Sequence, residues 1–386
     1  MAEECVFDIC VVGAGIVGSC AAYNALKYTK SVVLCEQFPL GHSRGSSHGH
    51  SRIIRKSYIQ EHYARMMPEA YKIWHELEQL SGEELLLNTG LLTLEDSPHE
   101  NILKMKRHLE GINADFKYLD RDGLKQKFPM LQHLGTYNAV YEPTGGILRA
   151  DKCCAVLQAL FKKNGGTTKE CFKVTKVIPG SVVTIASNES VIKAKSVIFT
   201  AGPWTNDILN PLGVHLPLQT MKINVCYWKA PDSVYSLKSG FPCFIDYTVK
   251  DGDNWHLYGL PNFEFPGLLK VCAHYGKVYH PDQRDAENDN KEVQVVAGYL
   301  KMFFKGVDSK PSIVDKCYYS WTPDEDFILD QHPVHKNIIF GAGFSGHGFK
   351  LAPVTGKILA QLASKIQPEY DLTPLRASRF DKKSNL

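Results

Sequence analysis

The first 36 residues constrain this chain more than any other stretch. They contain an apolar strand pattern at 7–12, the glycine pattern G-x-G-x-x-G at 13–18, a helix pattern at 16–27 and a second apolar strand pattern at 31–35. A strand, a glycine turn, a helix and a second strand in this order are typical of the βαβ unit that binds the diphosphate of a dinucleotide. We therefore predict a Rossmann-like α/β domain that binds a dinucleotide.

The glycines and the acid of this unit each have a separate physical role. Gly13 permits the tight turn, Gly15 lets the backbone approach the pyrophosphate, and Gly18 lets the helix pack on the strand. The N-terminus of the helix offers unpaired N–H groups and a partial positive charge to the phosphates. Glu36 follows the second strand, where an acid accepts hydrogen bonds from a ribose. The pattern alone does not choose between NAD and FAD.

Composition narrows the class of protein. The 386 residues, 44% of them hydrophobic, allow a substantial core and two domains. A net charge of +3 gives no case for nucleic acid as a partner, and no apolar run is long enough to span a membrane. The 11 cysteines are scattered without metal-ligand spacing. We therefore predict reduced thiols, an intracellular protein and no metal site.

The middle of the chain favours FAD over NAD. Short β-like runs at 172–200 lead into a turn that contains Ala201, Gly202 and Trp204. A β-meander followed by a strand, a glycine turn and a helix is typical of the second half of an FAD-type fold. The turn by itself is also compatible with an ordinary tight turn before a helix.

A second glycine turn lies near the C-terminus. The apolar strand pattern at 337–343 leads into a turn with Gly343 and Gly346, and a helix pattern follows from about 353 to 366. The N-terminus of that helix would stabilise negative charge on a reduced flavin. Lys350 lies in the same turn, as a ligand-facing cation or as a surface residue.

A basic segment follows the first domain pattern. The loop at 41–50 is rich in Gly, Ser and His and includes Ser46, and Ser51 then fits the cap of a helix. On such a helix Arg52 and Arg55 would lie on one face, on neighbouring turns. They suggest an anion site, although the stretch alone favours a solvated basic face.

Residues 217–276 are rich in β-like runs and predict an antiparallel sheet in a second domain. In the run GLLKVCAHYG, strand alternation places Lys270 and His274 on the same face. If that face is buried, the lysine needs a negative partner. By pattern alone, a solvated face is favoured.

Seven segments together resemble the monomeric sarcosine oxidase family of flavoproteins over nearly the full length of the chain. The resemblance implies an FAD-binding domain of the glutathione-reductase type over 1–85, 146–216 and 317–386, and an antiparallel-sheet substrate domain over 86–145 and 217–316. The segments are GAGIVG at 13–18, HSRGSSHGHSRIIR at 42–55, TAGPW at 200–204, LPLQT at 216–220, KVCAHYG at 270–276, KCYYSWTPDEDFILD at 316–330 and GAGFSGHGFKLAP at 341–353.

The resemblance also implies roles for single residues. FAD would be attached covalently through the thioether of Cys317. Arg55 and Lys350 would hold the substrate carboxylate, while Arg52 and Lys270 would lie on the other face of the flavin, where the lysine promotes reaction with dioxygen. The residues implied to line the substrate cavity are His48, Tyr258, His274 and Tyr319. The residues predicted to contact the cofactor are Gly13, Gly15, Gly18, Glu36, Ser46, Ser51, Arg52, Ala201, Gly202, Trp204, Cys317, Gly343, Gly346 and Lys350.

The activity implied by the resemblance is oxidation of a secondary amino acid to an imine, with reduction of dioxygen to hydrogen peroxide. Sarcosine, L-pipecolate and L-proline are the expected substrates. Two alternatives stay open: a flavin dehydrogenase that passes electrons to a protein acceptor, and a catalytically silent flavin-binding protein. We expect a monomer. The C-terminal Ser384-Asn385-Leu386 is a variant of the tripeptide that a peroxisomal import receptor binds, which predicts a peroxisomal location.

Overall fold

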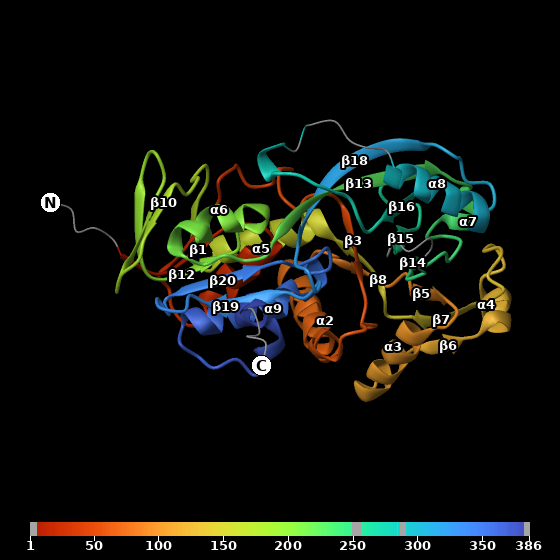
Figure 1. Cartoon of the computed structure of the whole chain (residues 1–386), viewed down its shortest axis with the longest axis horizontal. Coiled ribbons are helices and arrows are strands. Elements are labelled where there is room, and N and C mark those ends of the chain that lie inside the picture. The colour runs from red at the N-terminus through yellow and green to blue at the C-terminus, as the bar shows by residue number, and fades with distance from the viewer. Residues whose placement is uncertain (1–5, 249–255, 284, 286–290, 382–386) are drawn as a thin grey trace.

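The computed structural model of the chain describes residues 6–248, 256–283, 285 and 291–381. The molecule is elongated, with one large sheet towards each end of its long axis (Figure 1). The C-terminal tripeptide predicted to be an import signal lies outside the described residues. None of the cysteines in the described part of the chain forms a disulfide.

Among the described residues, eight strands form the first large sheet, which contains the predicted βαβ unit. β1 (Val6–Val12) pairs in parallel with β2 (Val32–Cys35) and with β12 (Val191–Phe199), and β12 pairs in parallel with β20 (Ile338–Ala342). These parallel pairs confirm the predicted parallel core. The predicted β-meander is confirmed as well, because β10 pairs antiparallel with β11 and β11 with β12. The other strands of this sheet are β9 (Thr167–Lys169), β10 (Lys176–Ile178), β11 (Val183–Ala186) and β19 (Ile328–Gln331).

Helices cover this sheet and bury its apolar strands. α1 (Ile16–Ala25) packs on α5 (Ala150–Lys163) and on α9 (Ala352–Ala363). α1 and α9 approach so closely that a side chain at Gly356 would lie 2.5 Å from Cβ of Cys20. α2 (Glu61–Ser81) buries an amphipathic stripe and continues through Pro68, as its hydrophobic spacing predicts. The N-terminus of α1 therefore lies at the glycine turn, held by packing on both sides.

Nine of the described strands form the second large sheet. Its pairs are antiparallel, as predicted, except that β14 and β5 run parallel. β18 pairs with β13 from residue 311 to 321, so the boundary predicted at residue 317 falls inside a strand of this sheet. The strands are β5 (Leu91–Asp96), β6 (Lys117–Leu119), β7 (Tyr137–Glu142), β13 (Gln219–Lys229), β14 (Cys243–Asp246), β15 (Leu257–Leu260), β16 (Leu268–Ala273), β17 (Lys277–Val278) and β18 (Pro311–Trp321).

A small sheet corrects one prediction. β3 (Ser51–Ile54) pairs antiparallel with β8 (Gly146–Arg149), which also pairs with β4 (Leu86–Leu87). Ser51 is therefore the first residue of a strand and not a helix cap, and Arg52 and Arg55 do not lie on neighbouring helical turns. The two isoleucines of this strand are buried, and β-branched side chains favour an extended, half-buried strand over a helix.

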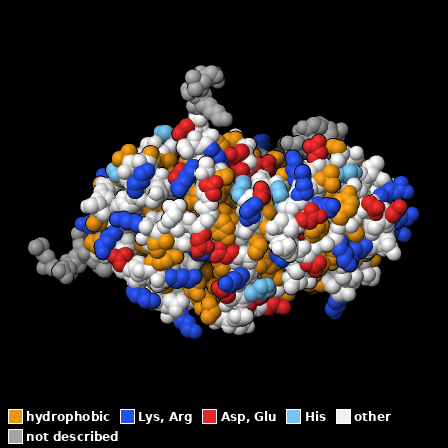
Figure 2. Space-filling view, turned by 90° about the horizontal axis from the view of Figure 1, so that it is seen from below, with side chains coloured by type: hydrophobic (Ala, Val, Ile, Leu, Met, Phe, Trp, Pro, Cys, Tyr) orange, Lys and Arg blue, Asp and Glu red, His pale blue; other side chains and the backbone are white. Residues whose placement is uncertain are grey.

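The remaining helices lie at the edges and over the second sheet (Figure 1). α8 contacts β13 and β16, and α3 contacts β5 and β7. No helix within the described residues is long and apolar enough to cross a membrane. Figure 2 shows basic and acidic side chains interspersed over the face seen from below. The bounds are α3 (Glu100–Gly111), α4 (Arg121–Lys127), α6 (Thr205–Leu209), α7 (Asp232–Tyr235) and α8 (Lys291–Phe303).

Candidate active site

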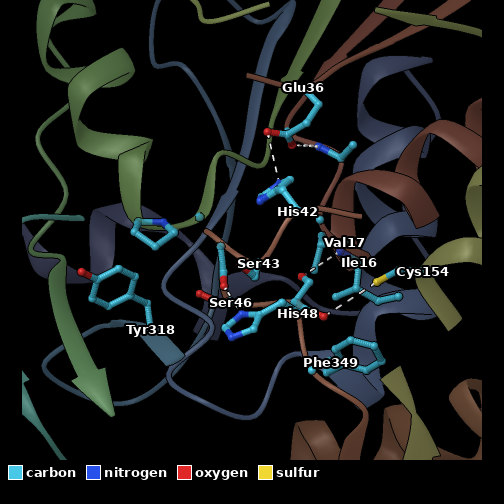
Figure 3. Close-up of a pocket in the computed structure, with 18 of the residues that line it drawn as sticks. Ile16, Val17, Glu36, His42, Ser43, Ser46, His48, Cys154, Tyr318 and Phe349 are labelled. Atoms are coloured by element: carbon cyan, nitrogen blue, oxygen red, sulfur yellow. Dashed lines mark hydrogen bonds and ion pairs between the residues drawn. The ribbon is translucent and has the colours of Figure 1, made fainter. Parts of the chain in front are cut away.

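A cleft of about 780 Å³ runs over the glycine turn (Figure 3). Its volume lies in the range of known cofactor sites. Segments far apart in the sequence line it: the glycine turn, the loop at 41–50, the turn after β12 and part of β18. Glu36 and His42 lie at one end of the close-up and His48 and Phe349 at the other.

The glycines of the turn are placed as a dinucleotide requires. Gly13 has φ +99°, and a Cβ there would lie 2.5 Å from the carbonyl oxygen of Thr200. A Cβ at Gly18 would lie 1.8 Å from the carbonyl oxygen of Gly13. At Gly15 a side chain would meet Ser47 Oγ at 3.0 Å, on the floor of the cleft. The three glycines thus add no side chain of their own at the point where a pyrophosphate would approach the helix, and Ser47 Oγ accepts from the first N–H of the helix, that of Ile16, at 3.0 Å.

Polar groups at both ends of the cleft suit a dinucleotide. Glu36 is buried, and its carboxylate accepts hydrogen bonds from the backbone N–H of Ala14 at 2.8 Å and of Phe38 at 3.1 Å. His42 Nε2 lies 3.4 Å from the same carboxylate. Ser46 Oγ is buried with no hydrogen-bond partner among the described residues. The acid at the end of β2 suits a ribose. The unpaired hydroxyl along the wall suits a polar chain that joins the pyrophosphate to a ring system.

The turn after β12 forms another wall of the cleft. Ala201 and Gly202 line it beside Trp204, whose indole N–H donates to Asp282 at 2.9 Å. This hydrogen bond joins the short 3-10 helix that follows β12 of the first sheet to the segment that follows β17 of the second sheet. The predicted residues of this turn are therefore brought to the cleft.

A smaller cavity of about 130 Å³ adjoins the cleft. Cys317 lines this cavity, is buried, and points its sulfur to within 3.8 Å of the carbonyl oxygen of Ser46. The residues that line both the cleft and the cavity are His48, Gly49, Arg52, Tyr227, Asp315, Tyr319, Gly346 and Phe349.

Two buried cations share the far side of this cavity. Arg55 Cζ lies 4.6 Å and Lys350 Nζ 5.8 Å from the ring centre of Tyr58. Arg55 donates through Nη1 to the hydroxyl of Tyr247 at 2.7 Å, but its Nε is buried with no hydrogen-bond partner among the described residues. Lys350 donates to the carbonyl oxygen of His347 at 3.1 Å. The surface alternative for Lys350 is wrong, because the residue is buried.

The electrostatics of the cavity favour a bound anion. Burial, followed by the charges of Arg55 and Arg52, holds the pKa of Lys350 well below its usual range. Burial, and then the neighbouring histidines and cations, likewise holds the pKa of His274 well below its usual range. His274 is therefore neutral at pH 7 and adds no further charge. A carboxylate between the two groups would offset the cost of burying positive charge and raise the pKa of Lys350, so that it binds as an ammonium.

Aromatic side chains also line the cavity. Tyr319 donates to the hydroxyl of Tyr258 at 3.5 Å, and the ring of His274 lies 5.0 Å from that of Tyr319. At Gly346 (φ +74°) a Cβ would lie 2.5 Å from the Tyr319 ring and 2.6 Å from the His274 ring. At Gly343 (φ +63°) a Cβ would lie 2.3 Å from Thr322. The second glycine turn thus brings backbone against the rings of the cavity.

Lys270 also faces the cavity, and the solvated alternative for its strand face is wrong. Lys270 Nζ donates to Glu264 at 2.8 Å and to Ser51 Oγ at 3.2 Å, so the lysine has the negative partner that a buried ammonium needs. Arg52 lies nearby, held by the carbonyl oxygens of Ser46 at 2.9 Å and Ser51 at 2.7 Å.

His48 joins the cleft to the cavity. Its ring nitrogens lie 2.6 Å from the carbonyl oxygen of Gly45 and 3.0 Å from that of Lys316. These contacts hold the loop at 41–50 against the start of the Cys317 segment. The structure thus brings every predicted site residue to the cleft, to the cavity or to the turns and strands that form their walls.

Several residues of the cavity escaped the sequence reasoning. Tyr58, Tyr247 and His256 line the cavity, and Glu264 pairs with Lys270 beside it. All four come from segments with no recognised motif. His256 stacks on His274 with ring centres 3.9 Å apart, and burial lowers its pKa to about 3. The one signal in the sequence was Lys270 itself, because a lysine on a buried strand face needs a negative partner. Glu264 lies six positions before this lysine.

Comparison with known proteins assigns the family. The model of FAD dependent oxidoreductases matches residues 8–362. Peroxisomal sarcosine oxidase of Mus musculus is 45% identical over 97% of this chain and 96% of its own length, and that of Homo sapiens is 43% identical over 98% and 97%. Among solved structures, NikD, an unusual amino acid oxidase essential for nikkomycin biosynthesis, superposes with a TM-score of 0.82 at 22% identity, covering 97% of this chain and 98% of that one.

Proposed function

Because the chain belongs to the FAD-dependent oxidoreductases, and among them to the sarcosine oxidase family of flavoprotein amine oxidases, we propose that it oxidises secondary amino acids with dioxygen. The substrates that we propose are sarcosine, L-pipecolate and L-proline. Sarcosine, dioxygen and water would yield glycine, formaldehyde and hydrogen peroxide. L-Pipecolate and dioxygen would yield the cyclic Δ1-piperideine-6-carboxylate and hydrogen peroxide.

One observation carries this proposal: the cavity holds two buried cations, and one of them has an unpaired donor. Arg55 and Lys350 both lie near the ring of Tyr58, and Arg55 Nε has no partner among the described residues. A carboxylate would accept from the guanidinium and the ammonium together, which fixes both its position and its orientation. An amino acid bound this way would place its α-carbon and nitrogen towards the shared wall of cleft and cavity.

The neutral state of the cavity's histidines suits an amine substrate. Because burial and nearby cations lower the pKa values of His274 and His256, neither ring repels the substrate or competes for its carboxylate. Tyr319 and Tyr258 would close the cavity against the aliphatic part of the substrate and exclude water. When bound, FAD would accept the electrons removed from the C–N bond of the substrate and pass them to dioxygen.

The residues of the cleft would hold the cofactor. Gly13, Gly15 and Gly18 leave room for the pyrophosphate, and Glu36 and Ser46 offer polar groups along the wall. We propose a thioether between Cys317 and a ring methyl group of the flavin, since this cysteine is buried in the cavity beside the shared wall. The S–H bond and one methyl C–H bond would break, and the two electrons would pass through the flavin to dioxygen, which leaves as hydrogen peroxide. Cys317→Ser should leave flavin that trichloroacetic acid extracts into the supernatant. Flavin that stays in the protein pellet would place the attachment elsewhere.

Dioxygen as the acceptor is the second part of the proposal. Lys270 is a buried ammonium on the cavity wall, where positive charge would stabilise the charge that develops as dioxygen is reduced. Stopped-flow reoxidation of the reduced enzyme tests this role. Fast reoxidation that Lys270→Met slows, without an equal effect on reduction, is expected for an oxidase. Slow reoxidation of the wild type, with fast electron transfer to an artificial acceptor, would support the dehydrogenase alternative.

We also propose that the protein acts as a monomer in peroxisomes. The two mammalian relatives are named peroxisomal, and a peroxide-forming reaction suits that compartment. The C-terminal Ser384-Asn385-Leu386 would bind the import receptor. A fluorescent protein carrying the last ten or so residues of the chain should colocalise with peroxisomes. Diffuse fluorescence would remove the tail as the signal.

A further inference from the structure

Glu264 lies at the centre of a buried polar cluster that also contains Lys270. Its Oε1 accepts from Lys270 Nζ at 2.8 Å and from the hydroxyl of Ser51, and its Oε2 accepts from the hydroxyl of Tyr227 at 2.7 Å. Only 3% of the Glu264 side chain and 7% of the Lys270 side chain are exposed. Three donors from three separate strands thus converge on one carboxylate, because Ser51, Tyr227 and Lys270 belong to β3, β13 and β16.

The cluster holds Glu264 as a charged group. Burial by itself raises the pKa of the Glu264 carboxyl, but the charge of Lys270 and the hydrogen bonds from Lys270, Ser51 and Tyr227 outweigh burial and leave the pKa below its usual range. A buried ion pair with all its hydrogen bonds made is stable, whereas removal of one partner leaves the other charge uncompensated. The other titratable or charged groups that face the pair from the surrounding elements are Arg52, Cys243, Tyr258, Cys272, His274, Asp315 and Cys317.

We propose that Glu264 is a positioning residue that keeps Lys270 charged and fixed at the wall of the cavity, so that the oxygen step does not depend on pH. This inference rests on the proposed role of Lys270 towards dioxygen. Hydrogen bonds to Glu264 and Ser51 leave the ammonium one direction in which to present its charge. The carboxylate also balances the charge of the lysine at longer range, whereas dioxygen beside the ammonium would still meet its positive end.

Removal of the carboxylate should make this site respond to pH. In Glu264→Gln, Lys270 stays protonated at low pH but has lost its counter-charge. The net charge near the flavin is then higher by one than in the wild type. As pH rises, burial without a counter-charge drives the proton off Lys270, and the extra charge disappears. The reduction potential of the flavin should therefore exceed that of the wild type at low pH and approach it at high pH, since positive charge favours the reduced, more negative ring.

The experiment compares the FAD-loaded wild type with Glu264→Gln, Lys270→Met and Glu110→Gln between about pH 6 and about pH 9.5. Equilibration with a reference dye gives the reduction potential, and stopped-flow mixing with oxygenated buffer gives the reoxidation rate. In Glu264→Gln we expect a pH-dependent difference in potential. Over the same pH interval the reoxidation rate should fall at least about tenfold, towards that of Lys270→Met. Glu110→Gln removes one carboxylate from an exposed lysine–glutamate pair on α3, away from the cleft and the cavity, and should behave as the wild type does.

A potential difference that is zero, or that stays constant over the whole pH range, would overturn the inference, because Lys270 would then keep its proton without Glu264. If Lys270→Met is reoxidised at the wild-type rate, the lysine has no role in the oxygen step. The reduction potentials of Glu264→Gln would then still decide what Glu264 does. If Glu264→Gln does not fold, Glu264→Ser removes the same charge, leaves room for water and carries the same expectations.

Discussion

The cofactor cleft is shaped mainly by backbone, whereas the substrate cavity beside it is shaped by charged and aromatic side chains. In the cleft, Gly13 and Gly18 set the distances between the turn, β12 and α1, and their missing side chains create the space. In the cavity, Arg55 and Tyr58 from the segment after β3 meet Lys350 from the turn before α9, far away in the sequence. Substitutions in the two regions should therefore fail in different ways.

The difference shows how one fold separates cofactor binding from substrate choice. A glycine turn tolerates no added atom, so changes there should remove the cofactor or the fold. Arg55 and Tyr58 follow β3, and Lys350 lies in the short 3-10 helix before α9, so none of them belongs to a strand of the first sheet. Changes to these side chains should therefore alter affinity and leave the cofactor bound. A cavity variant that loses FAD, or a variant of the glycine turn that keeps both FAD and the fold, would contradict this separation.

The largest expected effect comes from Gly18→Ala. The added Cβ would lie 1.8 Å from the carbonyl oxygen of Gly13, and fixed backbone cannot move aside as a flexible side chain can. We expect a loss of about 3 kcal/mol in stability and loss of bound FAD. Thermal unfolding and flavin absorbance of the purified protein measure both. Gly111→Ala is the matched control, since no atom lies within 4 Å of its added Cβ, and it should retain flavin and stability.

Arg55→Ala should have the next largest effect. Loss of the guanidinium removes charge-assisted hydrogen bonds to the substrate carboxylate, so the dissociation constant should rise about 100-fold. Flavin content should stay at the wild-type level, because Arg55 lines the cavity and not the cleft. Anaerobic titration with substrate measures the affinity. Arg65→Ala, at an exposed arginine of α2, serves as the control, and unchanged binding by Arg55→Ala would exclude Arg55 from the carboxylate site.

Tyr247→Phe should have the smallest effect of this series. The hydroxyl of Tyr247 accepts from Arg55 at 2.7 Å and holds the guanidinium in place, while the ring still packs against it. Loss of one such hydrogen bond costs about 1 kcal/mol, so the dissociation constant should rise roughly 5-fold. The same titration checks this value. An effect as large as that of Arg55→Ala would mean that Tyr247 contacts the substrate itself.

The sequence predicts the cleft better than the cavity, and the reason is physical. Gly13, Gly15, Gly18 and Glu36 act within one continuous unit, so local spacing was sufficient to predict the strand, turn, helix and acid. The parallel sheet and the antiparallel sheet were also predicted correctly from apolar runs and alternation.

The small β3 strand and the burial of the cations were not predictable from local pattern. Whether Ser51 caps a helix or begins a strand depends on pairing with β8, which lies almost a hundred residues away. The burial of Lys270 depends on Glu264, which lies just before β16, and on Tyr227 of β13 and Ser51 of β3, which hold that carboxylate from distant parts of the chain. Resemblance to a family named the cations, but only the fold shows which groups hold them in place.

The central claim is that the cavity orients a secondary amino acid by its carboxylate beside the flavin. Anaerobic titration of the wild type tests it with two matched pairs, L-pipecolate against piperidine and sarcosine against dimethylamine, by following flavin absorbance near ~450 nm. We predict that at least one amino acid bleaches the flavin and that the amine lacking a carboxylate does not. Equal bleaching by both members of a pair, or bleaching by none of the four with flavin present, would contradict the account.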